Sequence, residues 1–369
     1  MRMKTALSLT ALMAMAAPAA ALSQVKVVTT LQEYAAIARE VGGQRVKASA
    51  IAPAAEDAHF IKPKPSYALM LKDADLFVST GLDLELWSPV LVNKSHNRKI
   101  VDGAVGYVSA SHGINLLDKP VSLSRQAGDI HIYGNPHIST SPINVKITAT
   151  NIATGLCKVD PEGCPTYKAN LARFQDRISR RLYGDDLVDL LGAGTLDGLA
   201  APGRLVPFLK EKGMLDRLGG WLKEGLPFRG KTIICYHKNW IYFTTLFGLT
   251  IRTYVEPKPG IPPTARHVAD LIEMIPKEHI EVLLAANYFE RRKPQLIADR
   301  TGIKAVIVPT TVGGEPGVVT YFDLVDLWVR RLREAFQGAA GEADAESSSG
   351  GRTARAIDGL GGATAGAFR

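Results

Sequence analysis

Short β-branched runs alternate with helical segments in two separate blocks of the sequence, and this alternation restricts the fold most. The runs that resemble strands in the first block are 25–30, 46–51, 74–79 and 99–101. Those in the second block are 231–236, 252–255, 282–286 and 305–308. Strands joined through helices pair in parallel, with helices covering both faces of the sheet. The sequence therefore predicts an α/β protein with two lobes, each a parallel sheet flanked by helices.

One long helical pattern separates the two blocks. Its apolar residues recur every third or fourth position from Pro165 to Tyr183, and Gly184 ends it. We expect this helix to join the lobes as a stiff connection. The expected organisation is an N-terminal lobe at 24–160, the linking helix at 161–184, an irregular helical insertion at 185–227 and a C-terminal lobe at 228–337.

The two ends of the chain differ from the part expected to fold. Arg2 and Lys4 precede an apolar run at 7–17 and a small-residue cleavage site, the pattern of a signal peptide at 1–21. The apolar run is too short to span a bilayer. The sequence thus predicts export, to the periplasm in a cell with two membranes. Residues 338–369 are Gly, Ala, Ser and charged residues without periodicity, which is typical of a disordered tail.

The net charge of +8 comes from positive residues scattered along the chain. No basic helix or stripe of interleaved basic and aromatic residues occurs in the sequence, so nucleic-acid binding is not expected. We expect a monomer.

Two of the three cysteines are placed to form a disulfide. Cys157 and Cys164 bracket a turn-rich segment that can bring them together, and in an oxidising compartment such a bond contributes about 2–3 kcal/mol. A Cys–Cys metal pair is the alternative, although no second pair exists to complete it. Cys235 follows two isoleucines in a buried-strand pattern, which predicts a buried free thiol.

A stiff turn directly precedes one histidine. Gly134, Asn135 and Pro136 defeat both helix and central strand, so the chain just before His137 is rigid. A neutral imidazole aimed in this way is suited to be a metal ligand.

Three further side chains follow expected strands in a similar way. His59 comes after 46–51, His237 directly follows 231–236, and Glu290 comes after 282–286. Ligands of parallel sheets bind at the carboxyl ends of the strands. His59, His137, His237 and Glu290 therefore form the predicted ligand set, two from each lobe. Three imidazoles and one carboxylate suit tetrahedral Zn²⁺, with Mn²⁺ and Fe²⁺ as alternatives.

The other histidines are given weaker roles. His131 is interpreted as a solvated loop residue, with a partner behind a ligand or a transient metal acceptor as the alternatives. We expect surface positions for His96, His112, His267 and His279. Asp57 is placed to accept the second ring N–H of a ligating histidine.

Four segments of the chain together carry a resemblance to a known family. They are Glu56–Ser66, Gly134–His137, His237–Phe243 and Glu256–Pro263. Over Val25–Leu332 the chain resembles the zinc- and manganese-binding solute receptors of ABC importers. The resemblance implies two lobes joined by a long helix, metal ligands at His59, His137 and His237, and an importer permease in the inner membrane as partner.

The sequence departs from that family at three places. The first ligand is preceded by Asp57-Ala58, where the family usually has Asp-Pro. The fourth ligand of the family is a carboxylate, whose place Glu290 takes here. The histidine-rich loop of zinc members is absent, since only His112 lies between Ser111 and Ile130.

The expected function is capture of Zn²⁺, or alternatively Mn²⁺, outside the cytoplasm and delivery to the importer, without catalysis. One alternative is a zinc hydrolase that uses the same histidines with Glu290 as base, although no His-Glu-x-x-His motif occurs. A metal-binding adhesin or buffer on the same fold is the other alternative.

Overall fold

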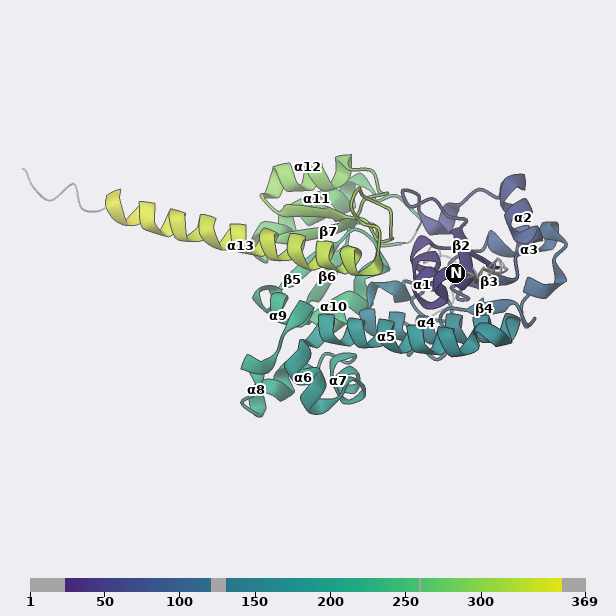
Figure 1. Cartoon of the computed structure of the whole chain (residues 1–369). Coiled ribbons are helices and arrows are strands. Elements are labelled where there is room, and N and C mark those ends of the chain that lie inside the picture. Colours follow the sequence, from purple (N-terminus) through teal and green to yellow (C-terminus); the bar gives the residue numbers. More distant parts are fainter. Residues whose placement is uncertain (1–23, 121–130, 259, 354–369) are drawn as a thin grey trace, which may run out of the picture.

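Two four-stranded parallel sheets, each flanked by helices, form the two lobes of the protein (Figure 1). The computed structural model describes residues 24–120, 131–258 and 260–353, with side chains up to Gln337. The predicted signal peptide at 1–21 lies outside these residues. The predicted fold class, two α/β lobes with parallel sheets, is confirmed.

The first lobe has the strand order β2-β1-β3-β4, with all neighbours parallel. Its strands are β1 (Val25–Thr29), β2 (Val46–Ala50), β3 (Leu76–Ser79) and β4 (Tyr107–Ser109). Its helices are α1 (Gln32–Gly42), α2 (Pro65–Lys72), α3 (Ser88–Ser95) and α4 (Pro142–Val159). Every residue of β3 is buried, because β3 lies inside the sheet and helices cover both faces.

One predicted strand of this lobe is wrong. Residues 99–101 do not join the sheet, and a 3-10 turn, η3 (Arg98–Ile100), takes most of that segment. The Asn97 side chain accepts the Lys99 backbone N–H at 3.1 Å and starts this turn. A side chain that bonds to the backbone of the next residues competes with strand pairing. The fourth strand therefore forms later, at Tyr107–Ser109.

The second lobe repeats the same topology, with the order β6-β5-β7-β8 and all neighbours parallel. Its strands are β5 (Thr232–Cys235), β6 (Thr250–Tyr254), β7 (Val282–Ala286) and β8 (Lys304–Val308). Its helices are α10 (Ile241–Phe247), α11 (Ala265–Lys277), α12 (Arg292–Thr301) and α13 (Tyr321–Thr353). Because the strand order reverses at β1 and at β5, the loops at the carboxyl ends of the strands separate there and leave room for a ligand.

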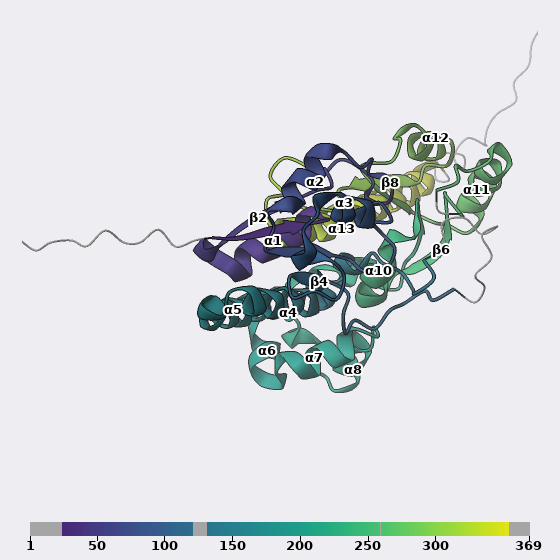
Figure 2. The same ribbon diagram turned by 90° about the vertical axis from the view of Figure 1, so that its right-hand side faces the viewer.

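The long helix α5 (Cys164–Tyr183) runs along the molecule beside both lobes (Figures 1 and 2). It packs on α1 and α4 of the first lobe and on α9 (Gly220–Glu224) towards the second. The predicted disulfide between Cys157 and Cys164 is confirmed and ties the end of α4 to the start of α5. Cys235 is buried and free, as expected.

The insertion after α5 is more regular than the sequence suggests. It contains α6 (Asp185–Leu191), α7 (Ala193–Ala200) and α8 (Leu205–Glu211), which lie below α4 and α5 (Figure 2). The buried Lys146 of α4 donates to Asp197 of α7 at 2.5 Å and to Ser179 of α5 at 2.8 Å, which fixes the insertion on the long helix. Helices α6 and α7 could not be predicted separately from the sequence. Gly184 and Gly192, both at positive φ, bound helices that are too short to show a clear helical period.

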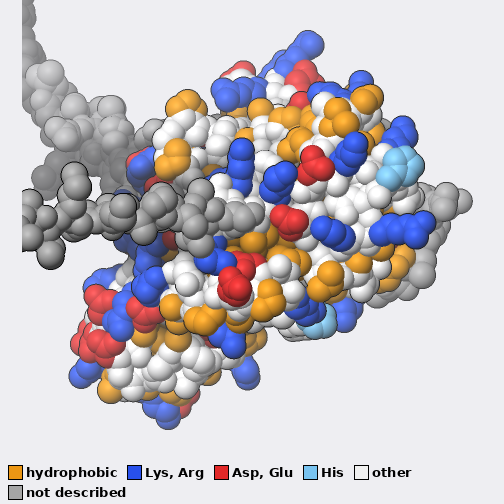
Figure 3. Space-filling view, turned by 45° about the vertical axis from the view of Figure 1, so that its right-hand side comes forward, with side chains coloured by type: hydrophobic (Ala, Val, Ile, Leu, Met, Phe, Trp, Pro, Cys, Tyr) orange, Lys and Arg blue, Asp and Glu red, His pale blue; other side chains and the backbone are white. Residues whose placement is uncertain are grey.

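The surface over these helices mixes charge of both signs (Figure 3). Acidic side chains gather at the lower left of this view. Helix α6 of the insertion exposes three acidic residues, Asp185, Asp186 and Asp189. Arg180 of α5 forms ion pairs with Asp185 and Asp189 of this group and also with Asp176 of α5. Part of the negative charge is therefore balanced locally.

One hydrophobic core runs through both lobes. It joins the first sheet to the helices of the second lobe through Phe77, Phe174, Trp221, Trp240 and Trp328, each at most 2% exposed. A smaller cluster lies on the other face of the second sheet, under α11 and α12. Since truncating one buried tryptophan costs about 3–5 kcal/mol, separating the lobes at the shared core is expected to be costly.

The last helix, α13, continues to Thr353, beyond the start of the expected disordered tail at 338. Figure 1 shows this extension projecting away from the lobes. No helix among the described residues is long and apolar enough to cross a membrane.

Asp160, at the end of α4, generates a stability prediction. Both of its carboxylate oxygens accept from Arg45 at 2.8 Å, and these bonds hold the pKa of Asp160 at about 2, below its usual 3.8. The unfolded chain therefore binds the proton more readily, so this contribution is present above pH 3.8 and is lost as the pH falls through about 2.

We expect Asp160→Asn to lower the free energy of unfolding by about 1 kcal/mol at pH 7, a modest value because the pair is partly exposed. Denaturant titrations should show the difference from wild type shrinking as the pH falls from 3.8 towards about 2. Asp185→Asn, on an exposed pair, is the control with little effect. A difference that does not change with pH would contradict this account.

Candidate metal centre

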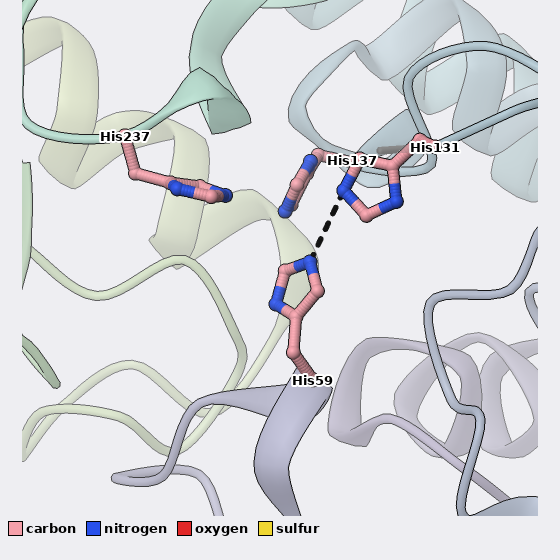
Figure 4. Close-up of side chains that lie close together, drawn as sticks. All are labelled: His59, His131, His137 and His237. Atoms are coloured by element: carbon pink, nitrogen blue, oxygen red, sulfur yellow. Dashed lines mark hydrogen bonds between the residues drawn. The ribbon is translucent and has the colours of Figure 1, made fainter. Parts of the chain in front are cut away.

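Four histidine side chains converge between the lobes: His59, His131, His137 and His237 (Figure 4). One nitrogen from each lies within 4.8 Å of the others. Nitrogens around a tetrahedral zinc ion are about 3.3 Å apart, given Zn–N distances of about 2.0–2.1 Å. The Nε2 atoms of His59 and His131 are already 3.2 Å apart. The cluster is therefore close to the size of a metal site.

The first lobe positions His59 through Asp57. His59 lies in a short turn, η2 (Ala58–Phe60), in the loop that follows β2. The Asp57 carboxylate accepts the backbone N–H of His59 at 3.0 Å and lies 2.6 Å from its ring Nδ1. Trp87 donates to the Ala58 carbonyl at 2.7 Å and holds the turn from behind. Asp57 thus has the role expected from the sequence.

The stiff turn before His137 is present as expected. Gly134 has a φ of +119°, and a Cβ there would lie 2.9 Å from the Leu116 side chain, so glycine is required. The Asn135 side-chain oxygen lies 3.0 Å from the backbone N and 2.9 Å from the ring Nδ1 of His137. The turn therefore fixes both the backbone and the ring of His137.

The second lobe contributes His237, two residues after β5. Glu256, which follows the neighbouring strand β6, places its Oε1 3.2 Å from Nδ1 of His237. The same oxygen accepts the backbone N–H of Gly260 at 2.8 Å. Glu256 was not predicted to contact a ligand histidine. The only sequence signal for Glu256 is its place at the start of Glu256–Pro263, a segment that carries the family resemblance.

Each of these three rings thus has an oxygen acceptor at Nδ1, which places the proton there and turns the Nε2 lone pair towards the centre. Nε2 of His137 and Nε2 of His237 are buried and have no hydrogen-bond partner among the described residues. Leaving a buried polar atom unpaired is costly unless another ligand satisfies it. The donor set therefore fits a bound cation.

Two of the imidazoles, those of His131 and His137, are also held neutral. Burial, together with the neighbouring His59 and His237, lowers the pKa of His131 to about 3. The same causes keep the pKa of His137 well below its usual 6.5. Burial opposes ionisation of Asp57, but its hydrogen bonds with His59 prevail and keep its pKa below 3.8. At neutral pH the centre thus offers neutral nitrogens in front and an ionised Asp57 behind them.

Glu290, the predicted fourth ligand, is not part of this cluster. Its side chain is exposed, beyond the turn that follows β7. The preceding Phe289 faces the site instead, with its ring stacked on Tyr236 at 4.3 Å and 5.8 Å from His237. Tyr288 accepts a hydrogen bond from Asn239 at 3.1 Å. This packing of the two aromatic residues fixes the turn and leaves Glu290 outside.

His131 is instead a member of the cluster, so its interpretation as a solvated loop residue is corrected. It is only 7% exposed and lies against His59. The six-residue spacing to His137 around a tight turn was the one sequence signal for it. Of the four histidines expected at the surface, His96, His112 and His279 are exposed. His267 is half-buried, with its Nε2 2.9 Å from the Tyr254 carbonyl oxygen.

Comparison with known proteins agrees with the fold. The family model described as zinc-uptake complex component A, periplasmic, matches residues 27–181 and 210–335. The chain belongs to this family. The unmatched residues 182–209 contain α6, α7 and the start of α8, so this part of the insertion falls outside the family match.

Named relatives cover most of the chain. The iron-binding protein YfeA of Yersinia pestis is 23% identical over 318 residues, which span 84% of this chain and 86% of that protein. The metal ABC transporter substrate-binding lipoprotein FimA of Streptococcus parasanguinis is 28% identical over 284 residues, or 76% and 78% of the two chains. These relatives are binding proteins and not enzymes, as was expected for this chain.

Solved structures share the fold. A crystal structure of ZnuA has a TM-score of 0.62 at 18% identity and covers 85% of this chain and 100% of its own. The Mn-bound periplasmic metal-binding protein from Candidatus Liberibacter asiaticus has a TM-score of 0.61 at 15% identity, with the same coverage.

Glu256 generates a prediction for the site. Glu256→Ala removes the acceptor behind His237 and is expected to weaken Zn²⁺ binding about 10–100-fold, the usual effect of losing such a partner. Competition with a chromophoric chelator on metal-stripped protein measures the affinity. Glu273→Ala, on the exposed face of α11, should bind like wild type. Equal affinity in the two variants would show that Glu256 does not position His237.

Proposed function

We propose that this protein is an extracytoplasmic solute-binding receptor that captures Zn²⁺ and delivers it to an ABC-type membrane importer. The observation that carries the proposal is the convergence of four imidazoles, with two buried Nε2 atoms that have no partner among the described residues. The proposed ligands are His59, His131, His137 and His237. The family match and the expected signal peptide at 1–21 support a place outside the cytoplasm.

The donor set favours Zn²⁺ over Mn²⁺, which is the alternative cargo. Imidazole nitrogens suit zinc at tetrahedral geometry, whereas manganese favours carboxylate and other oxygen ligands. Relatives are named for iron and for manganese, so membership of the family does not choose the ion. The replacement of the expected carboxylate by His131 is what supports zinc.

Charge balance is provided from behind the ligands. Imidazole binds a metal ion in its neutral form, so a divalent ion would bring two positive charges that the ligands themselves do not balance. Asp57 and Glu256 each lie at Nδ1 of a ligand histidine and offset that charge through the ring. The ion can thus be held without a carboxylate in direct contact with it.

The same arrangement argues against the hydrolase alternative. A catalytic zinc site keeps one position open for water, whereas four protein ligands complete a tetrahedral site. Glu290, the residue that would serve as general base, is exposed outside the cluster. Binding and release are therefore the function that the geometry supports best.

The structure and the sequence point to different fourth ligands, His131 and Glu290, and substitutions at these two residues can separate them. His131→Ala should weaken Zn²⁺ binding about tenfold or more, and His137→Ala further, while Glu290→Gln should bind like wild type. His131→Asp should also lower the ratio of Zn²⁺ to Mn²⁺ affinity, because it supplies an oxygen donor. Competition titrations of both ions on metal-stripped protein measure these values, with the exposed His112→Ala as control.

Loss of zinc affinity in Glu290→Gln equal to that in His131→Ala would restore the carboxylate as the fourth ligand. Full zinc affinity in His137→Ala would remove the proposed site altogether.

A further inference from the structure

Glu33 is a buried carboxylate that bonds to both lobes. It lies in the first turn of α1 and is 2% exposed. Ser139 donates to its Oε1 at 2.9 Å, and Thr311 donates to its Oε2 at 2.5 Å. Ser139 follows His137 by two residues in η5 (Ile138–Thr140), whereas Thr311 belongs to the loop after β8 of the second lobe.

A second bond joins the Ser139 segment to the second lobe. Tyr321, the first residue of α13 in the second lobe, donates to the Ser139 carbonyl at 2.8 Å. The segment next to His137 is therefore held from one side by Glu33 and from the other by the second lobe. The Thr311 loop also approaches the first lobe directly, since a Cβ on Gly314 would lie 3.3 Å from the Ala54 carbonyl oxygen.

We infer that Glu33 is a positioning residue that sets the separation of the lobes around the four histidines. His59, His131 and His137 come from the first lobe and its following loop, and His237 from the second, so the distance between lobes decides whether the four nitrogens meet. The Glu33 bridge contains no proposed metal ligand. It therefore orders the site before any ion arrives, which lowers the entropy cost of binding.

Burying the carboxyl group of Glu33 costs free energy, unlike placing a carboxylate at the surface. Burial raises the pKa of Glu33, and the hydroxyl donors Thr311 and Ser139 oppose that shift. The N-terminal turn of a helix favours a negative charge and offsets part of the cost. The two hydroxyls are thus the groups that satisfy the oxygens of the buried carboxyl group.

A matched carboxylate in the same lobe provides the control. Glu85 is also buried, and burial also raises its pKa. Its Oε1 accepts from Thr30 at 2.6 Å and from Thr80 at 2.7 Å, both within the first lobe. Removing one threonine hydroxyl at each carboxylate makes the same chemical change, but only one of the two bonds crosses between lobes.

The test compares Thr311→Val with Thr30→Val by amide hydrogen exchange of the metal-free protein. Thr311→Val should speed exchange about tenfold in segments 138–141 and 311–314, the effect of losing one hydrogen bond to a carboxylate. Thr30→Val should leave both segments unchanged, and Thr311→Ser, which keeps the hydroxyl, should behave like wild type. Ser139→Ala, which removes the other hydroxyl, should repeat the effect.

A second arm measures zinc dissociation and rests on the proposed function. Thr311→Val should release Zn²⁺ about tenfold faster, and Thr30→Val at the wild-type rate. If wild type fails to bind zinc, the proposed function falls while the exchange arm still decides on Glu33. Equal exchange in Thr311→Val and Thr30→Val, or wild-type exchange in both Thr311→Val and Ser139→Ala, would overturn the inference.

Discussion

The structure depends on holding four imidazoles so that one nitrogen of each faces the same point. Buried polar atoms without partners are unfavourable, so the protein must hold Nε2 of His137 and His237 in place by other contacts. It does so with an oxygen at Nδ1 of three rings, from Asp57, Asn135 and Glu256. These oxygens lie beside or on the strand-following loops that carry the histidines, so local structure and site chemistry come from the same residues.

The duplicated topology explains how distant segments meet. Both lobes have the same parallel strand order, and the loops at the carboxyl ends of their strands face one cleft. The shared hydrophobic core and the long helix α5 then limit how far the lobes can separate. Glu33 adds a polar bond across the same interface, close to His137. The shared core and α5 thus hold the lobes together, and the hydrogen bonds between the lobes set the distance between them at the site.

The sequence predicted what periodicity and turn chemistry control. The alternation of strands and helices predicted both lobes. The Gly134–Pro136 turn predicted a fixed position for His137, and the strand ends pointed to His59 and His237 as members of the same site. Glu290 lies outside the histidine cluster because its direction depends on how Phe289 packs against Tyr236, a contact that no local pattern encodes. His131 was missed for a similar reason, since its burial comes from a loop that folds against His59. Short helices divided by glycine, such as α7, also gave no clear period.

The central claim is that four imidazoles hold the metal and no carboxylate does. X-ray absorption spectroscopy of metal-stripped protein reloaded with one equivalent of Zn²⁺ tests it most directly. We predict four nitrogen neighbours at about 2.0–2.1 Å, with the multiple-scattering signature of imidazole for all four. A first shell that requires a carboxylate oxygen in place of one imidazole, or fewer than four imidazoles, would contradict the account.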